Sequence, residues 1–251
     1  MFRWLENVVN ECESPESNSL SVSWPAYHAT HSEKKDCDSG RAIGCLLPLF
    51  HDVAHSEAMI FHAMNVIRSA VHHVNPLQAP IIAMDQPLYA LAKKIQWAMK
   101  PSHGEDKFVI MFGGLHIEMA ALKLIGDLLA GSGWTAAIAE AGIATAGTAD
   151  SFLKANHVTK TRHAHQVNTS SLYLLLHKAY QESQTCQTGD MVPMSLDDWC
   201  CDRSNESRQF KFWYQVLLLT IDVLLFNRSI REANFMLYID TLKTSHLGFC
   251  S

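Results

Sequence analysis

Two short apolar runs with one helix-length segment between them constrain the fold of this chain more than any other feature. The runs cover residues 81–84 and 108–112, and Pro87 opens a series of apolar residues at helical spacing between them. Short apolar runs on either side of such a helix are typical of a β-α-β unit with parallel strands. We therefore predict a helix-rich α/β fold, with a small parallel sheet at about 80–113 and a mainly helical C-terminal half.

The candidate site residues of this unit follow the two predicted strands. Asp85 comes directly after the first strand, and Gly113, Gly114 and His116 follow the second. A crossover between parallel strands is almost always right-handed and brings both strand C-termini to one edge of the sheet. Open α/β folds place their chemistry at that edge, so we expect these residues to face a common crevice.

Each of these residues has a functional interpretation and a structural one. Asp85 is either a metal-binding carboxylate or the cap of the helix that follows it. Gly113 and Gly114 either cradle an anion at the next helix N-terminus or allow tight packing of strand against helix. His116 and Glu118 point about 200° apart on a helix, so we expect only His116 to face the crevice.

A second candidate site lies at the start of a helix predicted over about 161–182. It comprises Lys160, Arg162, His163 and His165. Positive charge is mildly unfavourable at a helix N-terminus, because the helix dipole favours negative charge there. A phosphate group, such as that of a nucleic-acid backbone, offsets this cost, and we predict phosphate binding. The alternative is a solvated helix start against which neutral histidines pack.

The rest of the chain divides into an irregular N-terminal part and one domain. Residues 1–42 are predicted as a helix followed by a polar irregular segment, and residues 43–251 as a single α/β domain. Two parallel strands do not form a sheet that stands alone, so we look for a further strand, for which GCLLPLF at 44–50 is the candidate. Helices are expected at 56–74, 116–130, 135–142, 161–182, 206–226 and 229–242, with shorter helical turns near 150–155 and 196–199.

Composition argues against several classes of protein. The net charge of −5 gives no basic footprint of a stand-alone nucleic-acid binder. The seven cysteines are odd in number and contain no Cys-x-x-Cys pair, which argues against a disulfide framework or a zinc ribbon. The longest apolar run, 210–226, contains Lys211 and Asp222 and is shorter than the roughly 20 residues of a spanning helix. We therefore expect an intracellular protein, nuclear or cytoplasmic, with no signal peptide and no transmembrane segment.

Several longer runs of the sequence resemble a family of metazoan proteins encoded by mobile or repetitive DNA. These runs are WPAYHA, LLPLF, MDQPLYALAKKIQW, GEDKFVIMFGGLHIEMA, GDLLAGSGWT, GTADSFLKANHVTKTRHAHQV and RSIREANFMLY. The resemblance covers roughly residues 22–240. Members of this family are similar in turn to RNase H-like transposases, in which a strand ends in a catalytic Asp, a helix follows, and a parallel strand ends beside the site.

The resemblance implies an ancestral role for the same residues. Asp85 would hold Mg²⁺ or Mn²⁺ for phosphodiester chemistry on DNA, His116 would line the site, and Arg162 with Lys160 would steer phosphate. An RNase H-like nuclease holds two metal ions with carboxylates from well-separated parts of the chain. Family members begin further upstream and continue past REANFMLY into Asp-His-x-x-Tyr-Ala-Arg-Trp, whereas this chain ends in DTLKTSHLGFCS. The resemblance thus implies a truncated copy, incomplete at both ends and without a working nuclease.

Three functions therefore stay open at the level of the sequence. The first is a transposon-derived, RNase H-like fragment whose nuclease chemistry is lost. The second is a non-catalytic module that binds DNA or a protein partner at the same α/β edge, or self-associates through an incomplete sheet. The third, a small-molecule enzyme that binds phosphate at Gly113 and Gly114, lacks a glycine-rich fingerprint and a P-loop lysine.

Overall fold

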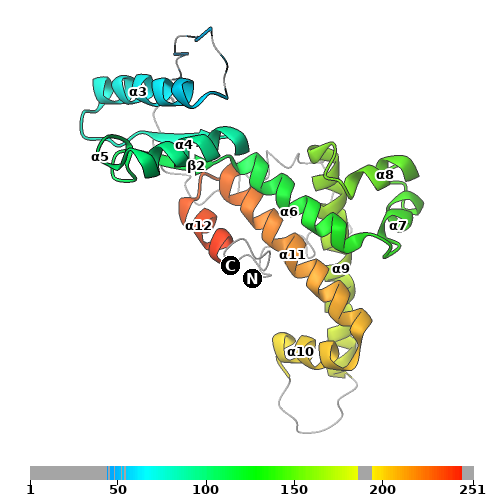
Figure 1. The fold of residues 1–251 in the computed structure, drawn as a ribbon. Coiled ribbons are helices and arrows are strands. Elements are labelled where there is room, and N and C mark those ends of the chain that lie inside the picture. The colour runs from blue at the N-terminus through cyan, green and yellow to red at the C-terminus, as the bar shows by residue number, and fades with distance from the viewer. Residues whose placement is uncertain are drawn as a thin grey trace. The chain divides into compact units, whose positions relative to one another are not determined.

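The predicted β-α-β unit is present and is accompanied by many helices (Figure 1). The computed structural model describes residues 44, 46, 47, 49–51, 53, 55–185 and 194–244. The chain divides into two compact units, one from Asp36 to Ile117 and one that holds the chain from Glu118 onward. Along the chain the elements are α3 (Glu57–Val74), β1 (Ile81–Met84), α4 (Gln86–Ala98), α5 (Lys100–His103), β2 (Val109–Phe112), α6 (Gly114–Leu129), α7 (Trp134–Glu140), α8 (Ala146–Phe152), α9 (Val158–Thr185), α10 (Leu196–Glu206), α11 (Arg208–Arg231) and α12 (Phe235–Thr244).

The first unit packs helices against one face of its sheet. β1 and β2 are parallel, with Ile81 opposite Val109 and Met84 opposite Phe112. α3 begins at Ser56, whose hydroxyl accepts the backbone N–H of Met59 at 3.1 Å, and packs on α4. A capped amphipathic helix of this kind buries one face and leaves the other in solvent. The buried core of this unit consists of Ile60, Met64, Ile82, Ala92, Ile95 and Phe108.

Polar contacts hold the start of β2 in place. The buried Gln96 side chain of α4 donates from Nε2 to the carbonyl oxygen of Phe108 at 2.8 Å. The buried His103 ring stacks on the Phe108 ring, with centroids 5.3 Å apart, and burial together with the nearby Arg68 charge lowers the pKa of His103. The Arg68 guanidinium also lies over the Phe108 ring, 5.5 Å from its centroid. These contacts hold Phe108, the residue directly before β2, in a fixed position.

The other face of the sheet carries apolar side chains that remain open to solvent. Ile81 is 61% exposed and its partner Val109 is 43% exposed, whereas Ile82 on the opposite face is buried. Alternate residues of a strand face opposite sides, so this pattern follows directly from the pleat. Parallel sheets are normally covered on both faces, which makes the exposed one unusual.

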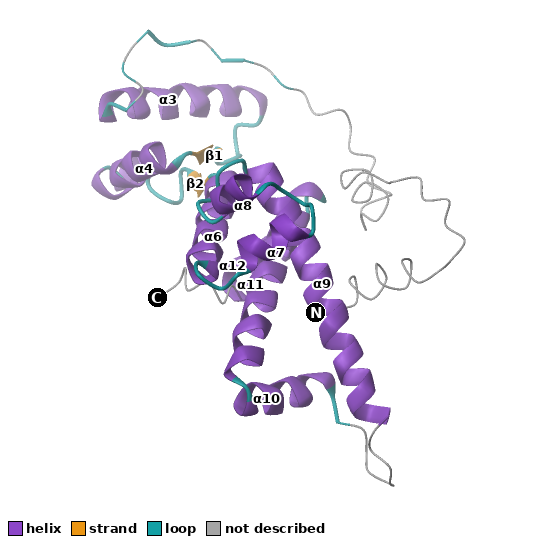
Figure 2. Cartoon of the chain, turned by 90° about the vertical axis from the view of Figure 1, so that its right-hand side faces the viewer, coloured by secondary structure: helices purple, strands orange, loops and turns teal. Residues whose placement is uncertain are grey.

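The second unit is helical and is built around α11. This helix contacts α9, α10 and α12, and Figures 1 and 2 show α9 and α11 side by side with α10 across their ends. Gly126 of α6 lies so close to the backbone of Leu153 that a Cβ would approach its carbonyl oxygen to 2.0 Å, so only glycine fits there. One core cluster joins α6, α7, α8, α9 and α11, and a second joins α9, α10 and α11.

α11 is the helix among the described residues that is long and apolar enough to cross a membrane by length and composition. Half of its most apolar window is buried inside the protein. It also buries polar side chains, including Thr220, Asp222, Asn227 and Ser229. These features are those of a helix that packs inside a protein core, as the sequence predicts.

The helix-rich α/β fold class is confirmed, while several elements differ from their predicted bounds. The described residues within 44–50 are not in a strand, and the predicted turn at 196–199 is the eleven-residue helix α10. α11 continues to Arg231 instead of ending at Phe226. The predicted single domain from residue 43 onward differs from the two units, each of which has its own core. The N-terminal helix and irregular segment predicted over 1–42 lie outside the described residues.

Candidate functional site

The residues predicted at the carboxyl edge of the sheet follow strand positions that lie side by side. Met84 pairs with Phe112, so the residues that come next, Asp85 and Gly113, leave the sheet at the same level. His116, in the first turn of α6, has its ring centroid 5.9 Å from that of Phe112. This register brings the first candidate site together at one edge of the sheet, as the topology of a β-α-β unit requires.

The Asp85 carboxylate is engaged in starting a helix. It is the N-cap of α4, and its Oδ1 accepts the backbone N–H of Leu88 at 3.2 Å. Pro87 in the first turn completes a typical start signal, because proline fits there without loss of a hydrogen bond. Within the described residues, no group of three or more His, Cys, Asp and Glu side chains is placed to hold a metal ion.

The two glycines serve the turn from strand to helix. The backbone N–H of Gly113 donates to the carbonyl oxygen of Met84 at 2.8 Å, and a Cβ on Gly113 would lie only 3.0 Å from that oxygen. Gly113 thus allows the close approach of the two strand ends, and its N–H already has an acceptor. Gly114 is the first residue of α6.

Arg162 of the second candidate site forms an ion pair with Glu118. The guanidinium donates from Nε and from an Nη to the two oxygens of Glu118, each at 2.6 Å. Glu118 is 3% exposed and Arg162 is largely buried. This two-point pairing is the strongest geometry that a guanidinium and a carboxylate can adopt, and it occupies the positive group that was expected to bind phosphate.

The three other residues of this site have different environments. Lys160 and His163 are exposed on the first turns of α9. His165 is only 2% exposed, and its ring stacks on the Trp134 indole with centroids 5.0 Å apart. Burial lowers the pKa of His165 to about 4, so the imidazole is neutral near pH 7 and adds no positive charge for a phosphate. Its environment matches the alternative of a neutral, packed histidine.

The buried cysteine of the described residues does not have the environment of a nucleophile. Cys200 is buried, and burial raises the pKa of its thiol to about 11, while Cys201 is exposed. A thiolate is the reactive form of cysteine, and a raised pKa suppresses it. Cys200 therefore acts as a small core residue in contact with α11.

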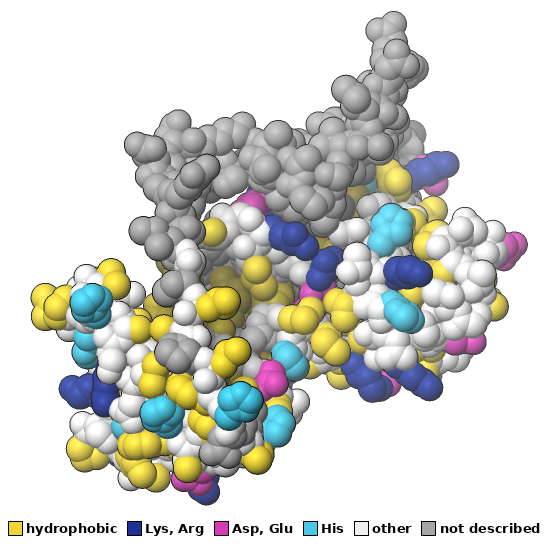
Figure 3. All heavy atoms as spheres, turned by 90° about the horizontal axis from the view of Figure 1, so that it is seen from above, with side chains coloured by type: hydrophobic (Ala, Val, Ile, Leu, Met, Phe, Trp, Pro, Cys, Tyr) yellow, Lys and Arg dark blue, Asp and Glu magenta, His cyan; other side chains and the backbone are white. Residues whose placement is uncertain are grey.

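The distribution of charge gives little support to a nucleic-acid surface. On the face drawn in Figure 3, Lys and Arg side chains are scattered among hydrophobic and uncharged groups instead of forming a stripe. Several lysines of the described residues pair with acids, as Lys93 does with Glu105 and Lys123 with Asp127, each at 2.6 Å. A nucleic-acid backbone is usually met by a continuous basic patch.

Comparison with known proteins places the chain in a family. Residues 23–197 match the model of a domain of unknown function, DUF8702. The chain belongs to the DUF8702 family. A search of curated proteins and a search of solved structures found no match. The DUF8702 match includes both candidate sites, the sheet edge and the start of α9.

We predict that the Glu118–Arg162 pair is structural. Glu118→Gln leaves a largely buried guanidinium without its carboxylate, and removing one partner of a buried pair costs about 3 kcal/mol or more. Urea unfolding at pH 7 should show this loss in the free energy of unfolding. Asp127→Asn on the same helix is the control, because it breaks the exposed pair with Lys123 and should cost less than about 1 kcal/mol. Equal losses in the two variants would contradict a structural role.

We also predict a pH-dependent stability that originates at His165. The unfolded chain takes up a proton near the ordinary histidine pKa of 6.5, whereas the folded protein does so only near pH 4. The contribution of the neutral His165 ring to the free energy of unfolding is therefore fully present above about pH 6.5 and is lost as the pH falls toward 4. Between pH 7 and pH 5 the loss is about 2 kcal/mol, from the 1.36 kcal/mol that corresponds to one pKa unit.

The measurement is urea unfolding at both pH values for the wild type and for His165→Phe, which keeps an aromatic ring against Trp134. On acidification from pH 7 to pH 5, the free energy of unfolding of the variant should fall by about 2 kcal/mol less than that of the wild type. His163→Phe, two residues away and exposed, should behave like the wild type. An unchanged pH dependence in His165→Phe would show that the imidazole is not the source.

Proposed function

We propose that this DUF8702 chain is a non-catalytic binding module derived from an RNase H-like transposase, and that its small sheet binds another polypeptide. The observation that carries the proposal is the open apolar face of the sheet, with Ile81 and Val109 exposed side by side. A two-stranded parallel sheet is not stable by itself in water, so a chain that adds strands or covers this face would bury apolar surface and extend the ladder.

The environments of the charged candidate residues support a binding role over nuclease chemistry. Asp85 already accepts the Leu88 N–H as a helix cap, and Arg162 already pairs with Glu118. A two-metal nuclease needs carboxylates that are free to bind Mg²⁺ or Mn²⁺ and positive groups that are free to meet phosphate. The apolar character of the open face favours a polypeptide over DNA as the partner. We expect the module to act inside the cell.

The first test separates metal binding from capping at Asp85. Under the proposal, millimolar Mn²⁺ does not change the thermal melting temperature of the wild type. Asp85→Asn keeps a good cap and should melt within about 1 °C of the wild type, whereas Asp85→Ala loses about 1 kcal/mol, or roughly 2–4 °C. An upward shift with Mn²⁺ that disappears in Asp85→Asn would instead restore the metal-site interpretation, since binding at a hundred times the Kd adds about 2.7 kcal/mol.

The second test addresses the sheet. Without its partner, the purified chain should associate with itself as its concentration rises, because open apolar strands offer both surface and backbone groups. Val109→Thr keeps a β-branched side chain but lowers the apolar character, and light scattering should show weaker association. Val74→Thr is the matched control, because Val74 is exposed at the end of α3 and is not in the sheet. A wild type that stays monomeric at every concentration would refute the proposal.

A further inference from the structure

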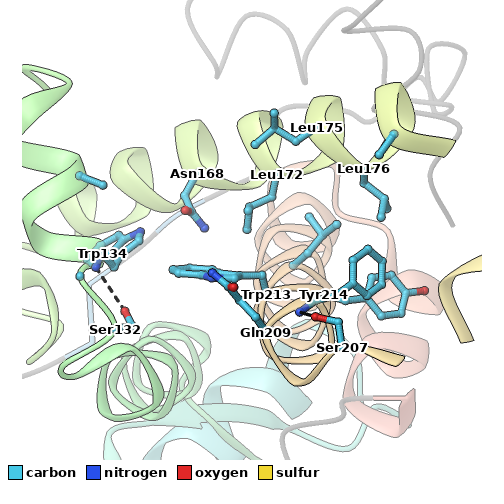
Figure 4. A pocket seen from close by; sticks show the side chains of 15 residues that line it. Ser132, Trp134, Asn168, Leu172, Leu175, Leu176, Ser207, Gln209, Trp213 and Tyr214 are labelled. Carbon is cyan, nitrogen blue, oxygen red and sulfur yellow. Dashed lines mark hydrogen bonds between the residues drawn. The ribbon is translucent and has the colours of Figure 1, made fainter. Parts of the chain in front are cut away.

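A cavity of about 710 Å³ lies within the helical unit and faces α7, α9 and α11 (Figure 4). Its size falls in the range of sites that take small organic molecules. The wall from α9 is aliphatic, the wall from α11 is largely aromatic, and the start of α7 closes a third side. The lining residues are Ser132, Gly133, Trp134, Ala137, Asn168, Leu172, Leu175, Leu176, Ala179, Ser207, Gln209, Phe210, Trp213, Tyr214 and Leu217.

The lining selects against charge. None of the described lining residues carries a charged side chain, and most are aliphatic or aromatic. A charged ligand would lose its hydration here without gaining an opposite charge, which is costly. Aromatic side chains that are partly exposed, such as Trp213 and Tyr214, offer flat surfaces that favour contact with another ring. The walls therefore fit a neutral, mainly apolar molecule with an aromatic ring.

Two hydrogen-bond donors in this lining lack acceptors among the described residues. They are the indole Nε1 of Trp134, which is 2% exposed, and the amide Nδ2 of Asn168. Figure 4 shows the Asn168 side chain reaching from α9 toward the space between the Trp134 and Trp213 rings. A buried donor without a partner is costly, and native proteins seldom leave one so. A ligand that carries an acceptor would satisfy both groups once the atoms that cover them shift, because each donor nitrogen has less than 1 Å² of accessible surface.

The Trp134 indole is held in place before any ligand arrives. Its backbone N–H donates to the hydroxyl of Ser132 at 3.2 Å, and that hydroxyl donates to the carbonyl oxygen of Leu129 at 2.7 Å. Gly133 caps α7 with a φ of 85°, a conformation that glycine adopts readily. The His165 ring stacks on the indole, with the two ring planes 14° apart. A site fixed in this way loses little conformational freedom on binding.

We propose that this cavity binds a neutral aromatic small molecule whose hydrogen-bond acceptor, such as a carbonyl oxygen, meets the N–H groups of Trp134 and Asn168. The proposal is independent of the sheet and of the partner proposed for it. The walls supply shape and apolar contact, while the two donors orient the ligand and select for an acceptor.

The test uses two neutral fluorescent dyes of similar size with the full chain. Prodan is a naphthyl ketone and supplies a carbonyl acceptor, whereas N-phenylnaphthylamine has no carbonyl. Fluorescence titration of the wild type should give tighter binding of prodan. Asn168→Leu removes the amide donor, and the loss of one hydrogen bond should weaken prodan binding by about three- to tenfold. The affinity for N-phenylnaphthylamine should stay within about twofold.

A second variant tests the location without removing a polar group. Ala137 is exposed and lines the cavity, so Ala137→Phe fills the space and should abolish binding of both dyes. Ala136→Phe is the matched control, because Ala136 is exposed on the same helix and does not line the cavity. Thermal melting of each variant checks that it is folded.

Three results would overturn the proposal. The first is a wild type that binds neither dye, which would show that the cavity does not take a neutral aromatic molecule. The second is equal binding by Ala137→Phe and Ala136→Phe, which would place the dyes elsewhere. The third is a wild type that binds prodan no more tightly than N-phenylnaphthylamine, together with an Asn168→Leu variant that weakens the binding of both dyes equally. That result would leave an apolar cavity with no preference for an acceptor.

Discussion

The helical unit depends on how the buried carboxylate of Glu118 is satisfied. A carboxylate taken out of water is costly unless an opposite charge and hydrogen bonds replace its hydration. Arg162 supplies the opposite charge and two N–H hydrogen bonds, each at 2.6 Å. The ion pair thereby connects α9, which carries Arg162, to α6, which carries Glu118. The pair thereby fixes the rotation of α9, and residues that follow at intervals of three, His165 and Asn168, take their places from it. The ion pair, together with the apolar contacts of α9 in the two core clusters, places these side chains beside Trp134 and the cavity.

The β-α-β unit could be predicted from the sequence because its signals are local. Each strand is a continuous apolar run, and Asp85 followed by Pro87 marks the helix start within three residues. The sequence predicts only one turn of α10 because few of its residues are apolar, although Ser195 and Asp198 form a capping pair that marks its start. The polar residues after Phe226 lead to the prediction that α11 ends there, whereas the helix continues to Arg231. Asn227 and Ser229 donate instead to the carbonyl oxygens of Val223 and Phe226 within the helix, so they do not break it.

The candidate site was predicted less completely, because its key contacts join distant parts of the chain. Glu118 and Arg162 are 44 residues apart, and no spacing rule connects them. The buried stripe of α9 near His165 includes Thr161, Ala164 and Thr169, which are small or polar and do not resemble a core pattern. For the same reason nothing in the sequence marks Asn168 as a site residue. The carboxyl edge of the sheet was predictable since it follows from strand topology alone.

Together these features describe a molecule that satisfies its buried charges internally and leaves apolar surface available. Asp85 and Arg162 are each engaged with protein groups, while the apolar side chains of Ile81 and Val109 are exposed. Proteins that bind nucleic acids through phosphate contacts lose affinity steeply with added salt. Binding at an apolar surface depends instead on the area removed from water, and its mark is a negative heat-capacity change. If the proposed polypeptide partner binds the exposed face of the sheet, its binding should therefore follow burial of apolar surface and not counterion release.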